Sequence, residues 1–205
     1  REVISGIYDA LKQFGFTGGN ILEPSMGVGN FYNGMSVDMA NNSRLYGVEI
    51  DDISGRIAKV LHPHANIQIC GVENADLPEN FFDCIIGNVP FGMSKPVDKR
   101  YDKNKFLIHD YFFAKSLDKV RTGGIVAFIT SKGTLDKENN AVRKYIAQRA
   151  ELIGAIRLPN NTFSKNADTN VTSDIIFLQK REKAIFDEPE WIHLGKNENN
   201  VVMNQ

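Results

Sequence analysis

The stretch Cys84-Ile85-Ile86-Gly87-Asn88-Val89-Pro90-Phe91 joins an apolar run to an amide, a proline and an aromatic ring. A short apolar run that ends in a turn predicts a buried strand, so Asn88 is expected at the strand's carboxyl end. There the side-chain oxygen of Asn88 and the carbonyl of Val89 can together accept both hydrogens of a planar amino group, while Phe91 offers a stacking surface. By themselves, these residues also fit an ordinary Asn-x-Pro turn, so the surrounding sequence has to distinguish the two readings.

The surrounding pattern alternates apolar runs with helical periodicity. Runs bounded by Gly, Pro, Asn or Asp predict seven strands, at residues 20–23, 44–49, 66–70, 82–87, 124–130, 152–157 and 174–179. Apolar positions at helical spacing predict helices at residues 3–14, 31–41, 52–61, 106–120 and 138–149. This alternation predicts a doubly wound α/β fold with a mostly parallel sheet and helices on both faces. Because residues 158–173 lack a long helical pattern, one of the last two strands is expected to run antiparallel at the sheet edge.

Composition limits the class of protein. With 205 residues, 42% hydrophobic and 24% charged, the chain is expected to form a single domain over residues 1–180, followed by an exit segment or linker at 181–205. A net charge of −1 argues against a strongly basic nucleic-acid binder, although a local basic face is compatible with it. No apolar run approaches the about 20 residues that span a bilayer, so no membrane contact is expected. The first residue is Arg1, which favours a piece of a longer protein.

Neither the cysteines nor the histidines predict a metal site. Cys70 and Cys84 form no CxxC pair and are expected to be free, buried thiols, which fits a reducing cytoplasm. The stretch His62-Pro63-His64 has no nearby cysteine or second histidine pair and predicts a turn.

Two acids follow the first two predicted strands. The stretch EPSMGVGNF at residues 23–31 places Glu23 before a turn that contains Gly27 and Gly29. The position three after Gly29 is not glycine, unlike in the dinucleotide fingerprint, and Glu23 would repel a phosphate but attract a cation. Glu49 lies about 20 residues further on, where an acid can accept both ribose hydroxyls. S-adenosylmethionine, an adenosine with a cationic, phosphate-free tail, suits both acids; alternatively, Glu49 only caps the next helix.

The order of these pieces resembles the N6-adenine-specific DNA methyltransferases with an Asn-Pro-Pro-Tyr/Phe motif. The resemblance rests on five stretches and covers roughly residues 1–180: EPSMGVGNF at 23–31, GVEID at 47–51, FDCIIGNVPF at 82–91, HDYFF at 109–113 and TGGIVAFIT at 122–130, continuing to RLPN at 157–160 and Phe163. It is similar above all to the methylase modules of type I restriction-modification systems and to those fused to helicases in phages and mobile elements. The resemblance implies the Rossmann-like fold of class I S-adenosylmethionine-dependent methyltransferases.

The resemblance also implies roles for individual residues. The turn after the first strand would face the methionine end of the cofactor through Glu23, Pro24, Ser25, Gly27, Gly29 and Phe31. Glu49 would bind the ribose and Ile50 one face of the cofactor's adenine. Glu73 would receive the adenine amino group, with Asp76 as its rival because the spacing differs by about one residue from the family pattern.

Aromatic residues complete the implied site. Phe112 would pack against the cofactor adenine, although it also fits the core stripe of a helix. Phe91 and Phe163 would stack on the two faces of the target base, and Phe163 fits a loop anchor equally well.

A base must leave the duplex to reach a buried methyl donor. In the motif Asn88-Val89-Pro90-Phe91, Asn88 and the Val89 carbonyl would hold its amino group for in-line transfer, by orientation and electrostatics and without a metal, and Phe91 would be the stacking floor. Valine replaces the family's first proline at position 89, so the fixed backbone angle of proline is lost and activity depends on this residue.

Partners and substrate follow from the same resemblance. DNA with a flipped adenine is the expected partner, and a target-recognition domain or helicase is expected elsewhere in the parent protein. Five basic and two acidic residues between 92 and 105 predict phosphate contacts or a solvated, mobile loop. Two other functions stay open: methylation of a release-factor glutamine or of guanine N2 in RNA, and a silent cofactor-binding or DNA-binding module.

Overall fold

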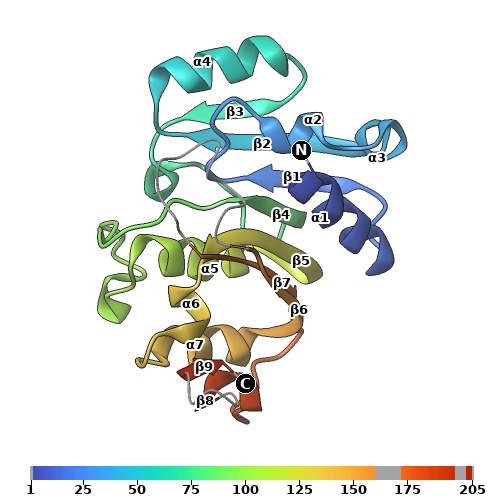
Figure 1. The fold of residues 1–205 in the computed structure, drawn as a ribbon. Coiled ribbons are helices and arrows are strands. Elements are labelled where there is room, and N and C mark those ends of the chain that lie inside the picture. Colours follow the sequence, from blue (N-terminus) through green and yellow to red (C-terminus); the bar gives the residue numbers. More distant parts are fainter. Residues whose placement is uncertain (1, 160–171, 197–201, 205) are drawn as a thin grey trace.

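A computed structural model describes residues 2–159, 172–196 and 202–204. Its centre is a seven-stranded sheet in the order β3-β2-β1-β4-β5-β7-β6. The strands are β1 (Gly19–Glu23), β2 (Ser43–Glu49), β3 (Asn66–Ile69), β4 (Phe82–Asn88), β5 (Val120–Ser131), β6 (Ala150–Arg157) and β7 (Ser173–Lys180). Each of the seven predicted strands therefore has a counterpart, and Figure 1 shows helices on both sides of the sheet.

The helices predicted at 3–14 and 52–61 are matched within one residue at each end, whereas those predicted at 106–120 and 138–149 are shorter in the structure. They are α1 (Glu2–Gln13), α2 (Asn30–Asn33), α3 (Val37–Asn41), α4 (Asp52–Leu61), α5 (Ile108–Lys119), α6 (Gly133–Asp136) and α7 (Ala141–Arg149). The single helix predicted at residues 31–41 is wrong, because Gly34 caps the end of α2 and the Ser36 hydroxyl accepts a hydrogen bond from the Met39 amide to start α3.

Both faces of the sheet are buried, which explains the nearly continuous apolar runs. Successive residues of a strand alternate between the faces. On β4, Ile85 packs with α5 and α7 in one core, whereas Cys84 and Ile86 pack with α1 and α4 in the other. Cys84 is fully buried and Cys70 only partly, and both are free thiols.

The antiparallel strand is β7, and it lies inside the sheet. It pairs antiparallel with both β5 and β6, so β6 forms the edge and runs parallel to the first five strands. The burial of the two strands explains this order: six consecutive residues of β7, from Ser173 to Leu178, are buried, whereas the end of β6 is exposed. An antiparallel strand near the edge is confirmed, but its place at the very edge is corrected.

The residues that follow β7 pack on α7. The Arg181 and Ile185 amides donate to the carbonyls of Arg149 and Gln148, and Ile192 is only 1% exposed. A small two-stranded sheet of β8 (Leu194–Lys196) and β9 (Val202–Asn204) follows the 3-10 helix η3 (Glu190–Ile192). The domain boundary at residue 180 stays a prediction, yet residues 181–192 contact the domain directly.

Candidate functional site

The predicted acids and the Asn88 motif meet at one edge of the sheet. Glu23, Glu49 and Asn88 are the last residues of the parallel strands β1, β2 and β4. Strands β1 and β4 are neighbours at the point where the strand order reverses, which is where ligands bind in doubly wound sheets. A Cβ atom at Gly87 would lie 3.6 Å from the Glu23 Cγ and 3.8 Å from the Pro24 Cδ. The backbone that leads into Asn88 therefore lies close to the first acid and its turn.

Glu23 is a buried acid with an unused oxygen. Glu23 is 2% exposed, and its Oε2 has no hydrogen-bond partner among the described residues. Burial, and after it the charge of Glu49, raises the pKa of Glu23 well above the usual value. A cationic group placed beside this carboxylate would relieve both effects, so the acid fits the ammonium end of S-adenosylmethionine.

Glu49 and the glycine turn are tied together. The Glu49 Oε2 accepts a hydrogen bond from the Gly27 amide at 2.7 Å, and its Oε1 accepts one from the Asp51 amide at 2.9 Å. Gly27 and Gly29 have φ angles of 53° and 84°, which favour glycine. No atom lies within 4 Å of a Cβ built on Gly27, whereas a side chain at Gly29 would collide with the His62 ring. The turn is thus open to a ligand at Gly27 and packed at Gly29.

Helix α4 begins at Asp52, three residues after Glu49, and Asp51 caps it by accepting a hydrogen bond from the Ser54 amide at 2.8 Å. The capping role considered for Glu49 therefore belongs to Asp51. The helix ends at His62-Pro63-His64, which forms a turn closed by the Ala65 amide on the His62 carbonyl, as predicted.

Ile50 and Glu73 line the same edge on the side of β2 and β3. Ile50 is 74% exposed next to Glu49, so its side chain is available to an adenine face. Glu73 is half-buried in the 3-10 helix η1 (Val72–Asn74), three residues after β3 ends, and its carboxylate folds over Gly71. Asp76 is exposed, and its backbone pairs with the Gln68 side chain at 2.8 and 2.9 Å. This geometry favours Glu73 over Asp76.

Other predicted cofactor residues sit deeper. Phe31 is 4% exposed in the core with α1, and Phe112 is 5% exposed in the core on the opposite face. Pro24 is buried and Ser25 half-buried in the turn. Direct cofactor contacts of Phe31 and Phe112 stay predictions. Phe163 lies outside the described residues.

The amide motif combines an exposed and a buried residue. Asn88 is exposed at the end of β4, whereas Val89 is 2% exposed and its amide donates to the Ile129 carbonyl on β5 at 3.1 Å. Pro90 is half-buried, and Phe91 is 39% exposed. The residue that replaces proline is thus fixed by packing and by a backbone hydrogen bond.

The structure adds a buried polar cluster to which the sequence analysis assigned no role. His109 is 5% exposed, its two ring nitrogens have no hydrogen-bond partner among the described residues, and its Nε2 lies 3.6 Å from the Asp110 Oδ1. Burial lowers the pKa of His109, with Asp110 opposing this effect. Lys137 pairs with the other Asp110 oxygen. The adjacent pair His109-Asp110 was visible in the sequence, but its burial depends on the packing of α5 against the end of β5.

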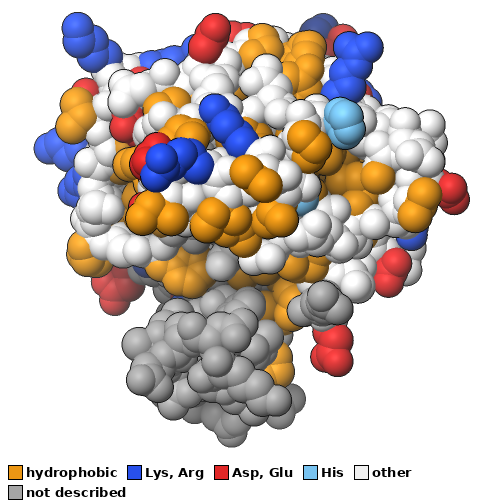
Figure 2. Space-filling model, turned by 90° about the horizontal axis from the view of Figure 1, so that it is seen from above, with side chains coloured by type: hydrophobic (Ala, Val, Ile, Leu, Met, Phe, Trp, Pro, Cys, Tyr) orange, Lys and Arg blue, Asp and Glu red, His pale blue; other side chains and the backbone are white. Residues whose placement is uncertain are grey.

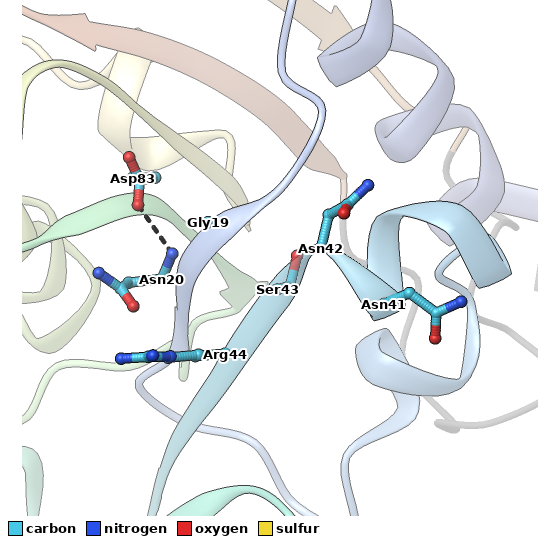
Figure 3. A pocket seen from close by; sticks show the side chains of 7 residues that line it. All are labelled: Gly19, Asn20, Asn41, Asn42, Ser43, Arg44 and Asp83. Carbon is cyan, nitrogen blue, oxygen red and sulfur yellow. Dashed lines mark hydrogen bonds between the residues drawn. The ribbon is translucent and has the colours of Figure 1, made fainter.

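A hollow of about 300 Å³ lies elsewhere, at the amino ends of β1, β2 and β4. Figure 3 shows Asn20, Arg44 and Asp83 around it. The backbone amide of Asn20 donates a hydrogen bond to the Asp83 Oδ2 at 2.7 Å. The hollow is on the sheet edge opposite to the acids. Within the described residues, no group of three or more His, Cys, Asp or Glu side chains is arranged to hold a metal ion, and no helix has the length and apolar character of a membrane span.

Solved structures identify the fold. A protein from Listeria monocytogenes assigned to the class I S-adenosylmethionine-dependent methyltransferases matches with a TM-score of 0.71 and 19% identity, over 91% of this chain and 60% of that chain. The methyltransferase subunit of a type I restriction-modification system from Streptococcus thermophilus matches with a TM-score of 0.68 and 16% identity, over 98% of this chain and 48% of that chain. The fold is that of the class I methyltransferases, as predicted.

The chain belongs to the N-6 DNA methylase family, whose sequence profile matches residues 2–203. The family expected from the motifs is therefore confirmed, and S-adenosylmethionine as cofactor agrees with this family and fold. Defense against restriction protein B of Escherichia phage P1 is 31% identical over 199 residues, which are 94% of this chain and 9% of that protein. The chain thus spans about a tenth of this curated relative.

Proposed function

We propose that this chain transfers a methyl group from S-adenosylmethionine to N6 of an adenine flipped out of DNA. The observation that carries the proposal is the closeness of the Asn88 motif to the first acid: a Cβ atom at Gly87 would be in van der Waals contact with Glu23 and Pro24, and Asn88 is exposed beside them. An amino-group acceptor and a cation-binding acid are thereby adjacent, as methyl transfer between two bound molecules requires.

The acids would hold the cofactor. Glu23 has a free buried oxygen for the ammonium group, Glu49 retains lone pairs for the ribose hydroxyls, and exposed Ile50 would cover the adenine, with Glu73 receiving its amino group. When bound, S-adenosylmethionine supplies an electrophilic methyl group on a sulfonium.

The amide motif would hold the acceptor base. The Asn88 side-chain oxygen and the Val89 carbonyl each accept one hydrogen of the adenine amino group, which directs the nitrogen lone pair toward the methyl donor. Phe91, with 39% of its surface exposed, stacks on the base, and Phe163 is proposed for its other face. The proton that leaves the nitrogen passes to solvent.

Target recognition is proposed to lie in other parts of a parent protein. The phage relative is about ten times longer than the matched region, and in the type I restriction-modification structures the methyltransferase is one subunit of the system. DNA, a recognition domain and a helicase are therefore the proposed partners in a restriction-modification or anti-restriction setting.

The test is transfer of a labelled methyl group to unmethylated DNA by the full-length parent protein. N6-methyladenine should be the labelled nucleoside after digestion. Asn88→Ala should reduce the rate at least about 100-fold, since orientation and charge stabilisation are lost together. Asn41→Ala, an exposed asparagine in α3, is the matched control and should leave the rate unchanged.

RNA and a release factor serve as alternative acceptors in the same assay. Transfer to either in preference to DNA would replace the proposal with the corresponding alternative. Binding of S-adenosylmethionine without transfer to any of the three acceptors would identify a silent module.

A further inference from the structure

The segment between Phe91 and α5, residues 92–105, is held in place by α5. We call it the post-motif loop. Its Asp98 Oδ2 accepts hydrogen bonds from the Tyr111 hydroxyl at 2.8 Å and from the Lys115 Nζ at 3.1 Å. The Ile108 amide donates to the Ser94 carbonyl at 2.9 Å, which fixes a second point of the loop. These hydrogen bonds argue against the alternative that the segment is a mobile loop.

A second set of contacts joins the loop to Glu79 and to Asp118 on α5. Arg100 pairs with Glu79 and with Asp118, both at 2.9 Å, and the Tyr101 hydroxyl donates to Asp118 at 2.5 Å. Burial opposes ionisation of Asp98, yet the hydrogen bonds from Tyr111 and Lys115 hold its pKa below the usual value. One basic and one acidic residue of the loop are thus committed to α5 and its neighbours.

The exposed side chains that remain are mostly basic or apolar, with Asp102 as the exposed acid of the loop. Four exposed lysines have no ion pair with another described residue: Lys95, Lys99, Lys103 and Lys105. Met93, before Lys95, and Val97, between Lys95 and Lys99, are 82% and 81% exposed, far above the 39% of Phe91. Exposed apolar side chains that alternate with unpaired lysines fit a ligand that has both negative charges and accessible apolar faces, such as a nucleic acid.

We propose that the post-motif loop is the surface on which the DNA backbone docks beside the flipped base. The lysines contact phosphates, and Met93 and Val97 enter the stack where the target base has left it. The proposal rests on the proposed function and adds the surface that holds the substrate. Charge complementarity selects DNA, because lysines bind phosphates as point charges and apolar wedges such as Met insert between bases.

A second exposed apolar surface, on α4, carries no such argument. Ile53, Ile57, Val60 and Leu61 are 44–79% exposed on α4, and Figure 2, viewed from the side of α4, shows hydrophobic side chains spread over that face. Nothing in the structure shows what covers them.

The experiment compares charge removal at the loop with charge removal elsewhere in the full chain. The loop variant is Lys95→Gln, Lys99→Gln and Lys103→Gln; the matched control is Lys12→Gln, Lys59→Gln and Lys183→Gln, three exposed lysines on α1, on α4 and after β7. Duplex DNA binding is measured at several salt concentrations. Each lost phosphate contact reduces the slope of log K against log salt by about 0.9, so three lost contacts should reduce it by about 2.7.

We expect the loop variant to bind duplex DNA about 10-fold to 100-fold more weakly at low salt, on every sequence tested. The control variant and the affinity of both variants for S-adenosylmethionine should match the wild type. A separate variant, Met93→Ser with Val97→Ser, should keep the salt slope and lower the fluorescence that 2-aminopurine gains at the target position when it leaves the stack.

The outcomes separate the two proposals. If the wild type methylates DNA and the loop variant binds and methylates it with an unchanged salt slope, the docking surface is wrong and the proposed function stands. If the wild type binds S-adenosylmethionine but neither binds nor methylates any DNA, both are overturned. If the wild type binds RNA more tightly than DNA through the loop lysines, and transfers the methyl group to RNA, the choice of DNA is overturned.

Discussion

Glu23 illustrates how one buried acid couples binding to stability. Glu23 is 2% exposed, and its Oε2 has no hydrogen-bond partner among the described residues. Burial, and after it the charge of Glu49, raises the pKa of Glu23. Below the usual pKa of a glutamate, both the folded and the unfolded chain hold the proton. As pH rises, the unfolded chain ionises first, so stability falls until the pH passes the folded-state pKa.

Glu23→Gln should therefore stabilise the unliganded protein at neutral pH. We expect a gain of about 1 kcal/mol, the order of cost of a buried unsatisfied polar group, which raises Tm by roughly 2–4 °C in a domain of this size. The gain should shrink toward pH 4. In calorimetry, S-adenosylmethionine should bind at least about tenfold more weakly, because a neutral amide replaces the partner of its ammonium group.

Exposed Glu182→Gln is the control for the Glu23 experiment and should change neither Tm nor affinity. A Glu23→Gln protein that melts below the wild type at pH 7 would show that the carboxylate has a stabilising partner in the free protein.

Val89 is fixed without the ring of proline. Its amide donates to the Ile129 carbonyl at 3.1 Å, and its side chain is buried in the core beside α5. Val89→Pro removes the hydrogen bond and restores a fixed φ. We expect a loss of about 0.5–1.5 kcal/mol of unfolding free energy in urea titrations and a single-turnover methylation rate within about twofold of the wild type. A rate gain above about tenfold would mean that valine leaves the motif poorly organised.

At the residue scale, the sequence indicated the groups that end strands and missed the groups that depend on packing between distant elements. Glu23, Glu49 and Asn88 follow apolar runs, so strand periodicity alone places them at one edge. Arg143 is 1% exposed and donates to the carbonyls of Leu135, Lys137 and Ile192. No local pattern predicts those acceptors, because they lie on separate segments.

At the element scale, strands were predicted more accurately than helices. A strand buried on both faces leaves a continuous apolar run that turn residues delimit clearly, and all seven were found. Helix ends depend on capping side chains, and the Gly34 and Ser36 caps divide a segment whose apolar spacing continues through it. The inner position of β7 was missed because the alternation of strands and helices and the length of an apolar run do not indicate which strands are neighbours in the sheet.

The attachment of the post-motif loop to α5 gives the prediction at this scale. Lys115 is 7% exposed, and Asp98 is the acid that pairs with it. Asp98→Asn should cost about 1.5–3 kcal/mol, the range for a hydrogen bond to a charged group, and should admit proteolytic cleavage within residues 92–105. Because the folded-state pKa of Asp98 is lowered, the stability it adds is present above the usual aspartate pKa and is lost as pH falls through the folded-state value.

Thermal melts and limited proteolysis from pH 3 to pH 7 provide the measurement. The difference between Asp98→Asn and the wild type should close at the acidic end. Asp52→Asn, which removes an exposed pair with Arg56 on α4, is the control and should have little effect. Equal cleavage of wild type and Asp98→Asn would show that α5 does not restrain the loop.

At the scale of the whole molecule, the sequence predicted the class of architecture, whereas the domain boundary at residue 180 stays a prediction. The alternation of strands and helices fixes a doubly wound sheet through the right-handed connections that parallel strands require. The charged residues after β7 indicated a linker because charge is typical of exposed chain. In the structure, the segment after these charges includes Ile192, which is buried, and Trp191, which is partly buried against the core.

The boundary can be tested by shortening the chain to residues 1–180. This removes Ile192 from the core and leaves the buried Arg143 Nε without its acceptor, the Ile192 carbonyl at 2.7 Å. Burial of one large aliphatic side chain contributes about 1.5–3 kcal/mol, and an unsatisfied buried donor costs about 1–3 kcal/mol. Urea unfolding of the shortened chain should therefore show a loss of at least about 3 kcal/mol. Ile192→Ala in the full chain removes most of the same packing but keeps the carbonyl. Its unfolding free energy should therefore lie between that of the wild type and that of residues 1–180. An unchanged unfolding midpoint for residues 1–180 would instead place the end of the domain at β7.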